Sequence, residues 1–328
     1  MLNYRDPLFS IIVFFILVLI VLIVMNISSY IKDKNRKKYI DEFISQFDFL
    51  DDKEIRSIFS DNVSFNSLLL LAIAFEKEGN YEKSLNIYLV LLEHSSLEKK
   101  YQILKNMAEV YFKAGFLQKA RDSLLEVLRS KPRDKEALKL LLLVNDKLKN
   151  YEEIENIIEI FEELDEDILK EKLYLEYQQA FFKSDKEKIR ELYKSYPTIL
   201  KRKYVEFFIK FNPKEVFDEV DEKDVYEMID IFWLETNLPL KNGAFIQIKA
   251  AKKELITTII SPIFEIEVLK HIPKNLGDLE FEYICEECKH LFPFYYDRCP
   301  NCKELFSFKV ETRLIDKREI KKGGRLVF

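Results

Sequence analysis

Residues 68–92 read LLLLAIAFEKEGNYEKSLNIYLVLL, and residues 104–128 read LKNMAEVYFKAGFLQKARDSLLEVL, at an offset of 36 residues. Each stretch has apolar residues at the spacing of an amphipathic helix, a central glycine, and a second helical pattern after it. The matched positions are Leu68, Leu71, Ala72, Phe75, Gly79, Tyr81, Ser84, Tyr88 and Leu92, then Leu104, Met107, Ala108, Tyr111, Gly115, Leu117, Ala120, Leu124 and Leu128. The match predicts two copies of a unit of two helices joined by a short turn.

A third and weaker copy follows 34 residues later, after Pro132, which stops the preceding helix. Its matching positions are Leu138, Leu141, Leu142, Lys149, Tyr151, Ile154, Ile158 and Phe161. The pattern resembles the tetratricopeptide repeat, in which two antiparallel helices form each unit and the units stack into a right-handed superhelix. The resemblance implies an all-α tetratricopeptide-repeat solenoid that is clearest over residues 64–164.

Two kinds of position in the copies have a physical reason. Small residues are expected where the paired helices approach most closely, because a large side chain would separate them. These small residues are Ala72, Ser84, Ala108 and Ala120. Gly79 and Gly115 suit the turn between the helices, where the residue past a helix end is often left-handed.

The helical pattern extends beyond the clear copies. Residues 39–59 have the spacing of a preceding helical pair, and residues 173–193 and 204–254 have helical spacing without the consensus glycine. We therefore expect residues 41–275 to form tetratricopeptide-like helical repeats, and the number of repeats between 165 and 270 stays open.

Such an array binds partners along the concave face that the first helix of each unit lines. The positions predicted to face this groove are Asn66, Leu69, Ile73, Glu76, Gln102, Lys105, Glu109 and Phe112. The alternative for some of them is packing against a neighbouring module. The repeat pattern therefore predicts that protein partners bind in this groove.

The N-terminal residues carry a membrane signal. Leu8 to Met25 is an apolar run with one polar interruption, Ser10. At ~1.5 Å per residue it reaches roughly 27 Å, about the thickness of the hydrocarbon core. A cleaved signal peptide is the competing interpretation, but the run is too long and no small-residue cleavage site follows. Residues 1–27 are expected to be a transmembrane anchor.

Flanking charges predict the orientation of that anchor. Residues 28–40 form a basic juxtamembrane segment, whereas only Arg5 and Asp6 are charged before the apolar run. Because cationic residues stay preferentially in the cytoplasm, we expect the N-terminus outside and the body of the chain inside. Recognition of anionic lipid by the basic segment is a second possibility.

The four cysteines of the chain are Cys285, Cys288, Cys299 and Cys302, spaced C-x2-C-x10-C-x2-C. Two such pairs can grip one metal ion tetrahedrally, so residues 276–328 are expected to form a rubredoxin-like or zinc-ribbon module with a basic tail. Because four sulfurs already complete the coordination of the metal, we expect His290 to be a surface residue rather than a ligand. Zinc and iron both stay open. Rubredoxin knuckles usually have glycine after the second cysteine, where this chain has lysine, and this favours a structural metal over a redox centre.

Other function classes fit the sequence less well. No nucleophile–base pair and no glycine-rich phosphate loop is recognisable, so an enzyme is not expected. A zinc knuckle that binds nucleic acid could use the basic residues after 316, but the net charge of −5 and the membrane anchor argue against it. We therefore expect no nucleic-acid partner.

The combination of anchor, repeats and terminal cysteine knuckles resembles the lipopolysaccharide assembly protein B family of Gram-negative bacteria. The similarity is best over residues 80–132, around Tyr81 and Gly115, and in the cysteine block with its ten-residue gap, Tyr283 and Pro300. The chain departs from that family in lacking tryptophan near the knuckles, where Tyr296 and Phe306 stand instead. Residues 165–270 also diverge from it.

This resemblance implies a single-pass protein of the bacterial inner membrane, with a periplasmic N-terminus and a cytoplasmic body. Members act as adaptors that present the deacetylase of the committed step of lipid A synthesis to a membrane AAA+ protease, and they gather lipopolysaccharide enzymes. The alternative is a general tetratricopeptide scaffold for another inner-membrane envelope machine, such as a secretion or appendage system.

Overall fold

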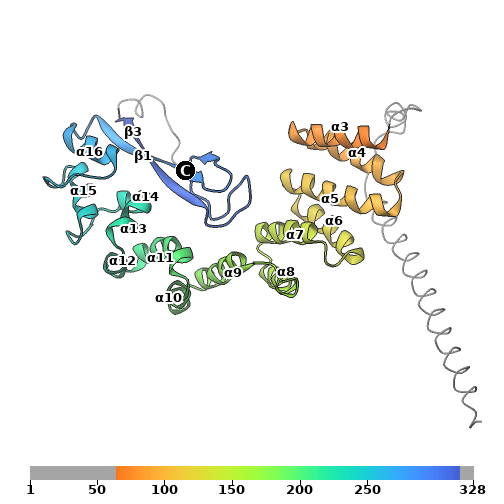
Figure 1. The fold of residues 1–328 in the computed structure, drawn as a ribbon, viewed down its shortest axis with the longest axis horizontal. Coiled ribbons are helices and arrows are strands. Elements are labelled where there is room, and N and C mark those ends of the chain that lie inside the picture. The colour runs from red at the N-terminus through yellow and green to blue at the C-terminus, as the bar shows by residue number, and fades with distance from the viewer. Residues whose placement is uncertain (1–63, 318–328) are drawn as a thin grey trace, which may run out of the picture. The chain divides into compact units, whose positions relative to one another are not determined.

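The computed structural model describes residues 64–317, and these divide into two compact units that meet in sequence between Leu164 and Asp165 (Figure 1). The predicted anchor, the basic segment, the preceding helical pair and the tail after residue 317 lie outside the described residues. Within the described part, no helix is both long enough and apolar enough to cross a membrane.

The first unit consists of consecutive helical hairpins. Its described helices are α3 (Phe65–Lys77), α4 (Tyr81–Glu93), α5 (Leu97–Lys113), α6 (Leu117–Ser130), α7 (Lys135–Leu148) and α8 (Tyr151–Glu163). Each helix packs against its neighbours in the chain, as expected for stacked two-helix units. The three copies identified in the sequence correspond to the pairs α3–α4, α5–α6 and α7–α8.

Small residues allow close helix packing in this unit, as the repeat pattern predicted. Ala72 and Ser84 are fully buried between α3 and α4, and the Ser84 hydroxyl donates a hydrogen bond of 2.8 Å to the Ala72 carbonyl. Ala108 and Ala120 are fully buried at the same positions of the next pair. A larger side chain at any of these positions would force the two helices apart.

The second unit begins with helices and ends with a sheet. Its helices are α9 (Leu169–Phe182), α10 (Lys186–Ser195), α11 (Pro197–Phe211), α12 (Pro213–Glu219), α13 (Glu222–Glu227), α14 (Ile229–Leu234), α15 (Gly243–Ala251) and α16 (Phe264–His271). The helices α12 to α14 are much shorter than a repeat helix. Prolines at the start of α11 and α12 and a capping box of Asp221 and Asp224 at α13 divide the chain here. The predicted helical stretch is therefore less regular than a repeat array.

One turn recurs between paired helices in both units. Gly79 and Gly115 have φ values of 79° and 83°, and Lys149 and Ser184 take the same left-handed conformation with 59° and 53°. In all four turns the amide after this residue donates to a carbonyl five residues earlier, at 2.8 to 3.0 Å, as in a Schellman motif. The α9–α10 pair is thus a fourth unit of the same local design, without the glycine that would have marked it.

The C-terminal sheet has three antiparallel strands in the order β2-β1-β3. They are β1 (Gly277–Cys285), β2 (Leu291–Phe292) and β3 (Phe308–Asp316), with Gly277 paired to Asp316 and Cys285 to Phe308. Leu279 belongs to the same hydrophobic core as α9 to α16, and Phe281 and Val310 pack against that core. The sheet and its cysteines therefore share one folding unit with these helices.

Candidate metal centre

The four predicted ligands come together at one end of the sheet. Cys285 is the last residue of β1, Cys288 lies in the turn after it, and Cys299 and Cys302 lie in the loop before β3. All four sulfurs lie within 4.8 Å of one another. The Sγ–Sγ distance is 3.6 Å from Cys285 to Cys302 and 3.7 Å from Cys288 to Cys299.

These distances suit a tetrahedral metal. A zinc ion bound at about 2.3 Å by four thiolates would separate the sulfurs by about 3.8 Å, whereas a disulfide needs about 2.0 Å. The cluster could therefore hold one metal ion with all four positions filled by protein. Zinc and iron share this ligand set, so the geometry does not select between them.

Both cysteine pairs form the same backbone turn. The amide of Cys285 donates to the His290 carbonyl at 3.0 Å, and the Cys299 amide donates to the Glu304 carbonyl at 2.8 Å. Lys289 and Lys303, which follow the second cysteine of each pair, have left-handed φ values of 59° and 68°. The backbone therefore adopts the conformation for which glycine is favoured, although the chain has lysine at both places.

The thiols differ in their readiness to ionise. A hydrogen bond from the Asn301 side chain lowers the pKa of Cys288 to about 5, whereas desolvation and then the neighbouring thiols raise the pKa of Cys302 to about 12. Four thiolates at this separation repel one another, so a cation among them is needed for all to ionise. Metal binding should therefore release protons from the cluster.

Two side chains that are not ligands adjoin the sulfurs. The hydroxyl of buried Ser307 lies 3.3 Å from the Cys285 sulfur. His290 is exposed, and its Nδ1 lies 3.2 Å from the Cys288 carbonyl and 3.2 Å from the Asn301 amide nitrogen. These contacts position the knuckle backbone around the ligands.

The second knuckle, which we define as residues 297–306 around Cys299 and Cys302, is attached to α9 by charged and aromatic contacts. Arg298 donates two hydrogen bonds, of 2.8 and 2.7 Å, to the carboxylate of Glu171. The ammonium of Lys170 lies 2.5 Å from Glu304, and Tyr174 packs edge-on against Phe306 with ring centres 6.1 Å apart. The knuckle is thus held against the first helix of the second unit.

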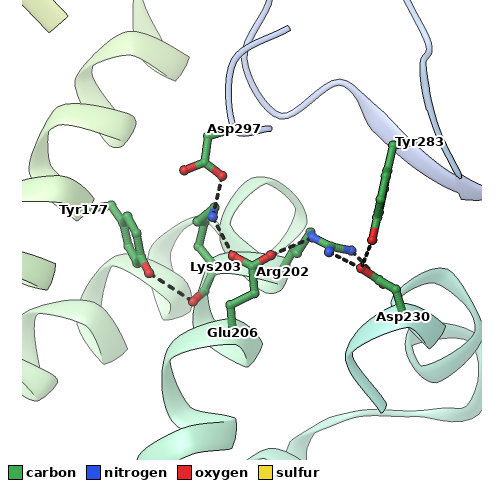
Figure 2. Close-up of polar contacts among 7 residues, drawn as sticks. All are labelled: Tyr177, Arg202, Lys203, Glu206, Asp230, Tyr283 and Asp297. Carbon is green, nitrogen blue, oxygen red and sulfur yellow. Dashed lines mark hydrogen bonds and ion pairs between the residues drawn. The ribbon is translucent and has the colours of Figure 1, made fainter. Parts of the chain in front are cut away.

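A second set of contacts joins α11 and α14 to the sheet (Figure 2). Arg202 binds both carboxylate oxygens of Asp230, at 3.1 and 2.5 Å, and also binds Glu206 at 2.8 Å. The Tyr283 hydroxyl of β1 donates to Asp230 at 3.0 Å. The Arg202 guanidinium lies 3.7 Å from the ring centre of Tyr295, which is a close cation–π contact.

Lys203 extends the same network towards the second knuckle. Its ammonium binds Glu206 at 2.5 Å and is also paired with Asp297, two residues before Cys299. The Tyr177 hydroxyl donates to the Lys203 carbonyl at 3.3 Å. Burial, which is only partly offset by Lys203, raises the pKa of Asp297 above its usual range. Sequence reasoning missed this network, because its members are spread over more than a hundred residues and match no motif.

The predicted groove residues lie on α3 and α5 and are partly connected. The ammonium of Lys113 lies 2.6 Å from Glu76 and 2.8 Å from Glu109, so this lysine joins groove positions on both helices. Lys105 pairs with Asp134 at 3.1 Å and with Glu136 at 2.7 Å.

The remaining groove positions are at least partly accessible. Asn66 and Gln102 are exposed. Leu69, Ile73 and Phe112 are partly buried. Contact of these residues with a partner stays a prediction.

Comparisons with known proteins bear on the fold only. A scan against protein-family models finds no match, and a search of curated proteins finds none. A solved structure entitled "Functional Characterization of Pseudomonas Aeruginosa pilF" is similar with 17% identity over 48% of this chain and 72% of its own, at a TM-score of 0.34. A tetratricopeptide repeat protein from Parabacteroides merdae has 18% identity over 67% of this chain and 87% of its own, at a TM-score of 0.40.

At these levels, the similarity identifies no function. The tetratricopeptide-type architecture rests instead on the helix pairs of the chain and their recurrent turn. The more specific resemblance to the lipopolysaccharide assembly protein B family stays a prediction.

Proposed function

We propose that this protein is a non-enzymatic adaptor that binds protein partners on its helical repeats and uses a structural metal ion to complete its second unit. The observation that carries the proposal is the closed four-sulfur cluster packed against tetratricopeptide-type helices. A catalytic metal site needs an open coordination position, and four protein ligands leave none. The repeat helices supply an extended surface of the kind that binds other proteins.

The specific form of the proposal follows the module order. We infer that residues 1–27 anchor the chain in the bacterial inner membrane and that the body is cytoplasmic. There it would present the deacetylase that commits carbon to lipid A to a membrane AAA+ protease, and so regulate lipopolysaccharide synthesis. The support is the resemblance of the anchor, the repeats and the cysteine block to one family.

A mild-detergent affinity purification of the full-length protein from native membranes tests this proposal. Mass spectrometry should identify the AAA+ protease together with lipid A enzymes among the co-purifying proteins. Depletion of the protein should raise the level of the deacetylase. Recovery of a different envelope machine, with neither the protease nor lipid A enzymes, would favour the general scaffold instead.

A variant with two exposed groove residues changed tests whether partners bind in the groove, and a variant changed elsewhere is its control. Replacing Asn66 and Gln102 with lysine should reduce partner recovery without changing the fold, because both side chains are exposed on α3 and α5. The same two changes outside the predicted groove, at exposed Asn156 of α8 and exposed Gln118 of α6, should leave recovery unchanged. Equal recovery with all variants would argue against binding in the predicted groove.

A further inference from the structure

The second unit contains a pocket of about 490 Å³ that the function proposed above does not use. Residues of α9, α11, α14, β1 and the second knuckle line it, so it lies between the helices and the sheet. Its volume falls in the range of about 300–1,000 Å³ that is typical of pockets for small ligands. Six of the seven residues of the network in Figure 2, all except Arg202, line its polar wall.

That polar wall carries more negative than positive charge. Arg202 and Lys203 are the two cations of the network, and they serve three carboxylates, those of Glu206, Asp230 and Asp297. Each carboxylate has an ion pair, but the three carboxylates outnumber the two cations by one. At the rim, Lys210 and Glu235 add one charge of each sign.

The other walls are apolar and accessible. Phe181 and Leu234 line the pocket and are 44% and 78% exposed. Large apolar side chains that stay this accessible beside a pocket are typical of a binding surface. A ligand that fits both walls therefore needs a positive charge close to an apolar group.

We propose that this pocket binds an arginine or lysine side chain of a partner protein, with an adjoining apolar residue packed on Phe181 and Leu234. The cation would add the third positive charge that the three carboxylates lack. An anionic ligand is disfavoured, because it would meet the excess of carboxylates. The inference rests on the proposed adaptor function only in taking a protein as the source of the cation.

The chain contains its own reporter for this test. Trp233 is its only tryptophan, and it precedes Leu234 on α14 with its indole nitrogen 3.2 Å from Asp278. The peptide acetyl-Leu-Arg-Leu-amide, titrated into the full-length metal-loaded protein, should change the Trp233 fluorescence saturably. The same peptide with glutamine in place of arginine should bind at least about tenfold more weakly, since it lacks the charge.

Two pairs of variants distinguish the pocket from the rest of the surface. E235K and L234S change the rim, and they should weaken binding of the arginine peptide by about tenfold and about threefold. E227K and L240S are the matched controls, because both residues are exposed in the same unit and do not line the pocket. These two should bind the peptide as the unchanged protein does.

Three outcomes would overturn the inference: equal binding of the arginine and glutamine peptides, no saturable binding of either, or equal effects of rim and control variants. None of them would affect recovery of partners through the repeat groove. Conversely, a failed affinity purification would leave the peptide titration valid. The two proposals can therefore fail separately.

Discussion

Lys289 and Lys303 occupy a backbone conformation that ordinary residues avoid. A non-glycine residue in the left-handed region costs about 1–3 kcal/mol. Both lysines are tolerated because the turn beside each cysteine pair is fixed by backbone hydrogen bonds, such as the one of 2.9 Å from the Lys289 amide to the Cys285 carbonyl. The strain is therefore a consequence of building a metal knuckle without glycine.

Changing Lys289 to glycine should stabilise the second unit by about 1 kcal/mol, because glycine adopts this φ without a Cβ clash. The matched variant is Lys289→Ala, which removes the same side chain but keeps the Cβ atom, and it should show no gain. Urea unfolding of the metal-loaded variants measures the difference. A loss of stability with glycine would show that the lysine side chain matters more than its backbone.

The Arg202–Asp230 pair joins α11 to α14, and Asp230 also accepts the hydrogen bond from Tyr283 of β1. Their side chains are 14% and 8% exposed. Arg202→Met should destabilise the second unit by about 3–5 kcal/mol, because it leaves carboxylates buried without their cation. The double variant R202M/D230L should recover a large part of this loss.

The control for that prediction is a pair on the surface. Arg133 and Glu163 approach to 3.6 Å with side chains 70% and 67% exposed, so Arg133→Met should cost less than about 1 kcal/mol. Thermal unfolding of the two variants and the control measures the ranking. A double variant as unstable as R202M alone would mean that the loss comes from packing rather than from unpaired charge.

At the scale of elements, the recurrent turn separates what could be predicted from what could not. Gly79 and Gly115 marked two units in the sequence, because glycine reports a left-handed backbone directly. Lys149 and Ser184 adopt the same conformation, but their side chains carry no such signal, so the fourth pair was only seen as helical spacing. The structure shows that its hydrogen bond, not its glycine, defines the turn.

The metal cluster and its surroundings show the same division. The spacing of the cysteines was enough to predict that their sulfurs meet. Nothing in the sequence joined Arg298 to Glu171, or Lys203 to Asp297, because residues so far apart are brought together only by the tertiary fold. The attachment of the knuckles to α9 and α11 therefore had to come from the structure.

Changing Ser184 to glycine tests the turn. We expect a gain of about 1 kcal/mol in stability, since Ser184 is exposed and has a φ of 53°. Ser195→Gly is the matched change at the last residue of α10, where glycine should cost up to about 1 kcal/mol. Opposite signs in chemical denaturation would support the turn assignment, and equal signs would contradict it.

For the whole molecule, the division into two units predicts how metal loss spreads. The knuckles contact α9 and α11, so removing the ion should loosen these helices as well as residues 276–317. Hydrogen exchange of the full-length protein, with and without a chelator, should show lost protection in α9, α11 and β1. The helices α3 to α6 should exchange as before, because they belong to the other unit.

The variant C285S/C288S should show the same exchange pattern as the chelator-treated protein. Native mass spectrometry should show that this variant has lost the one metal ion that each unchanged chain binds. Ser307→Ala, which removes a hydroxyl near the cluster but no ligand, should retain the ion. Exchange changes confined to residues 276–317 would show that α9 and α11 hold their structure without the knuckles.

The contact between Glu171 and Arg298 also sets an order of events during synthesis. The two residues are 127 positions apart, and the chain grows at about 5–20 residues per second. Glu171 must therefore stay in solvent for about 6–25 s before its partner leaves the ribosome. The first unit can fold within this time from contacts between neighbouring helices. Metal loading then becomes the last step of maturation, and cells short of the ion would accumulate chains whose first unit is complete and whose second unit is not.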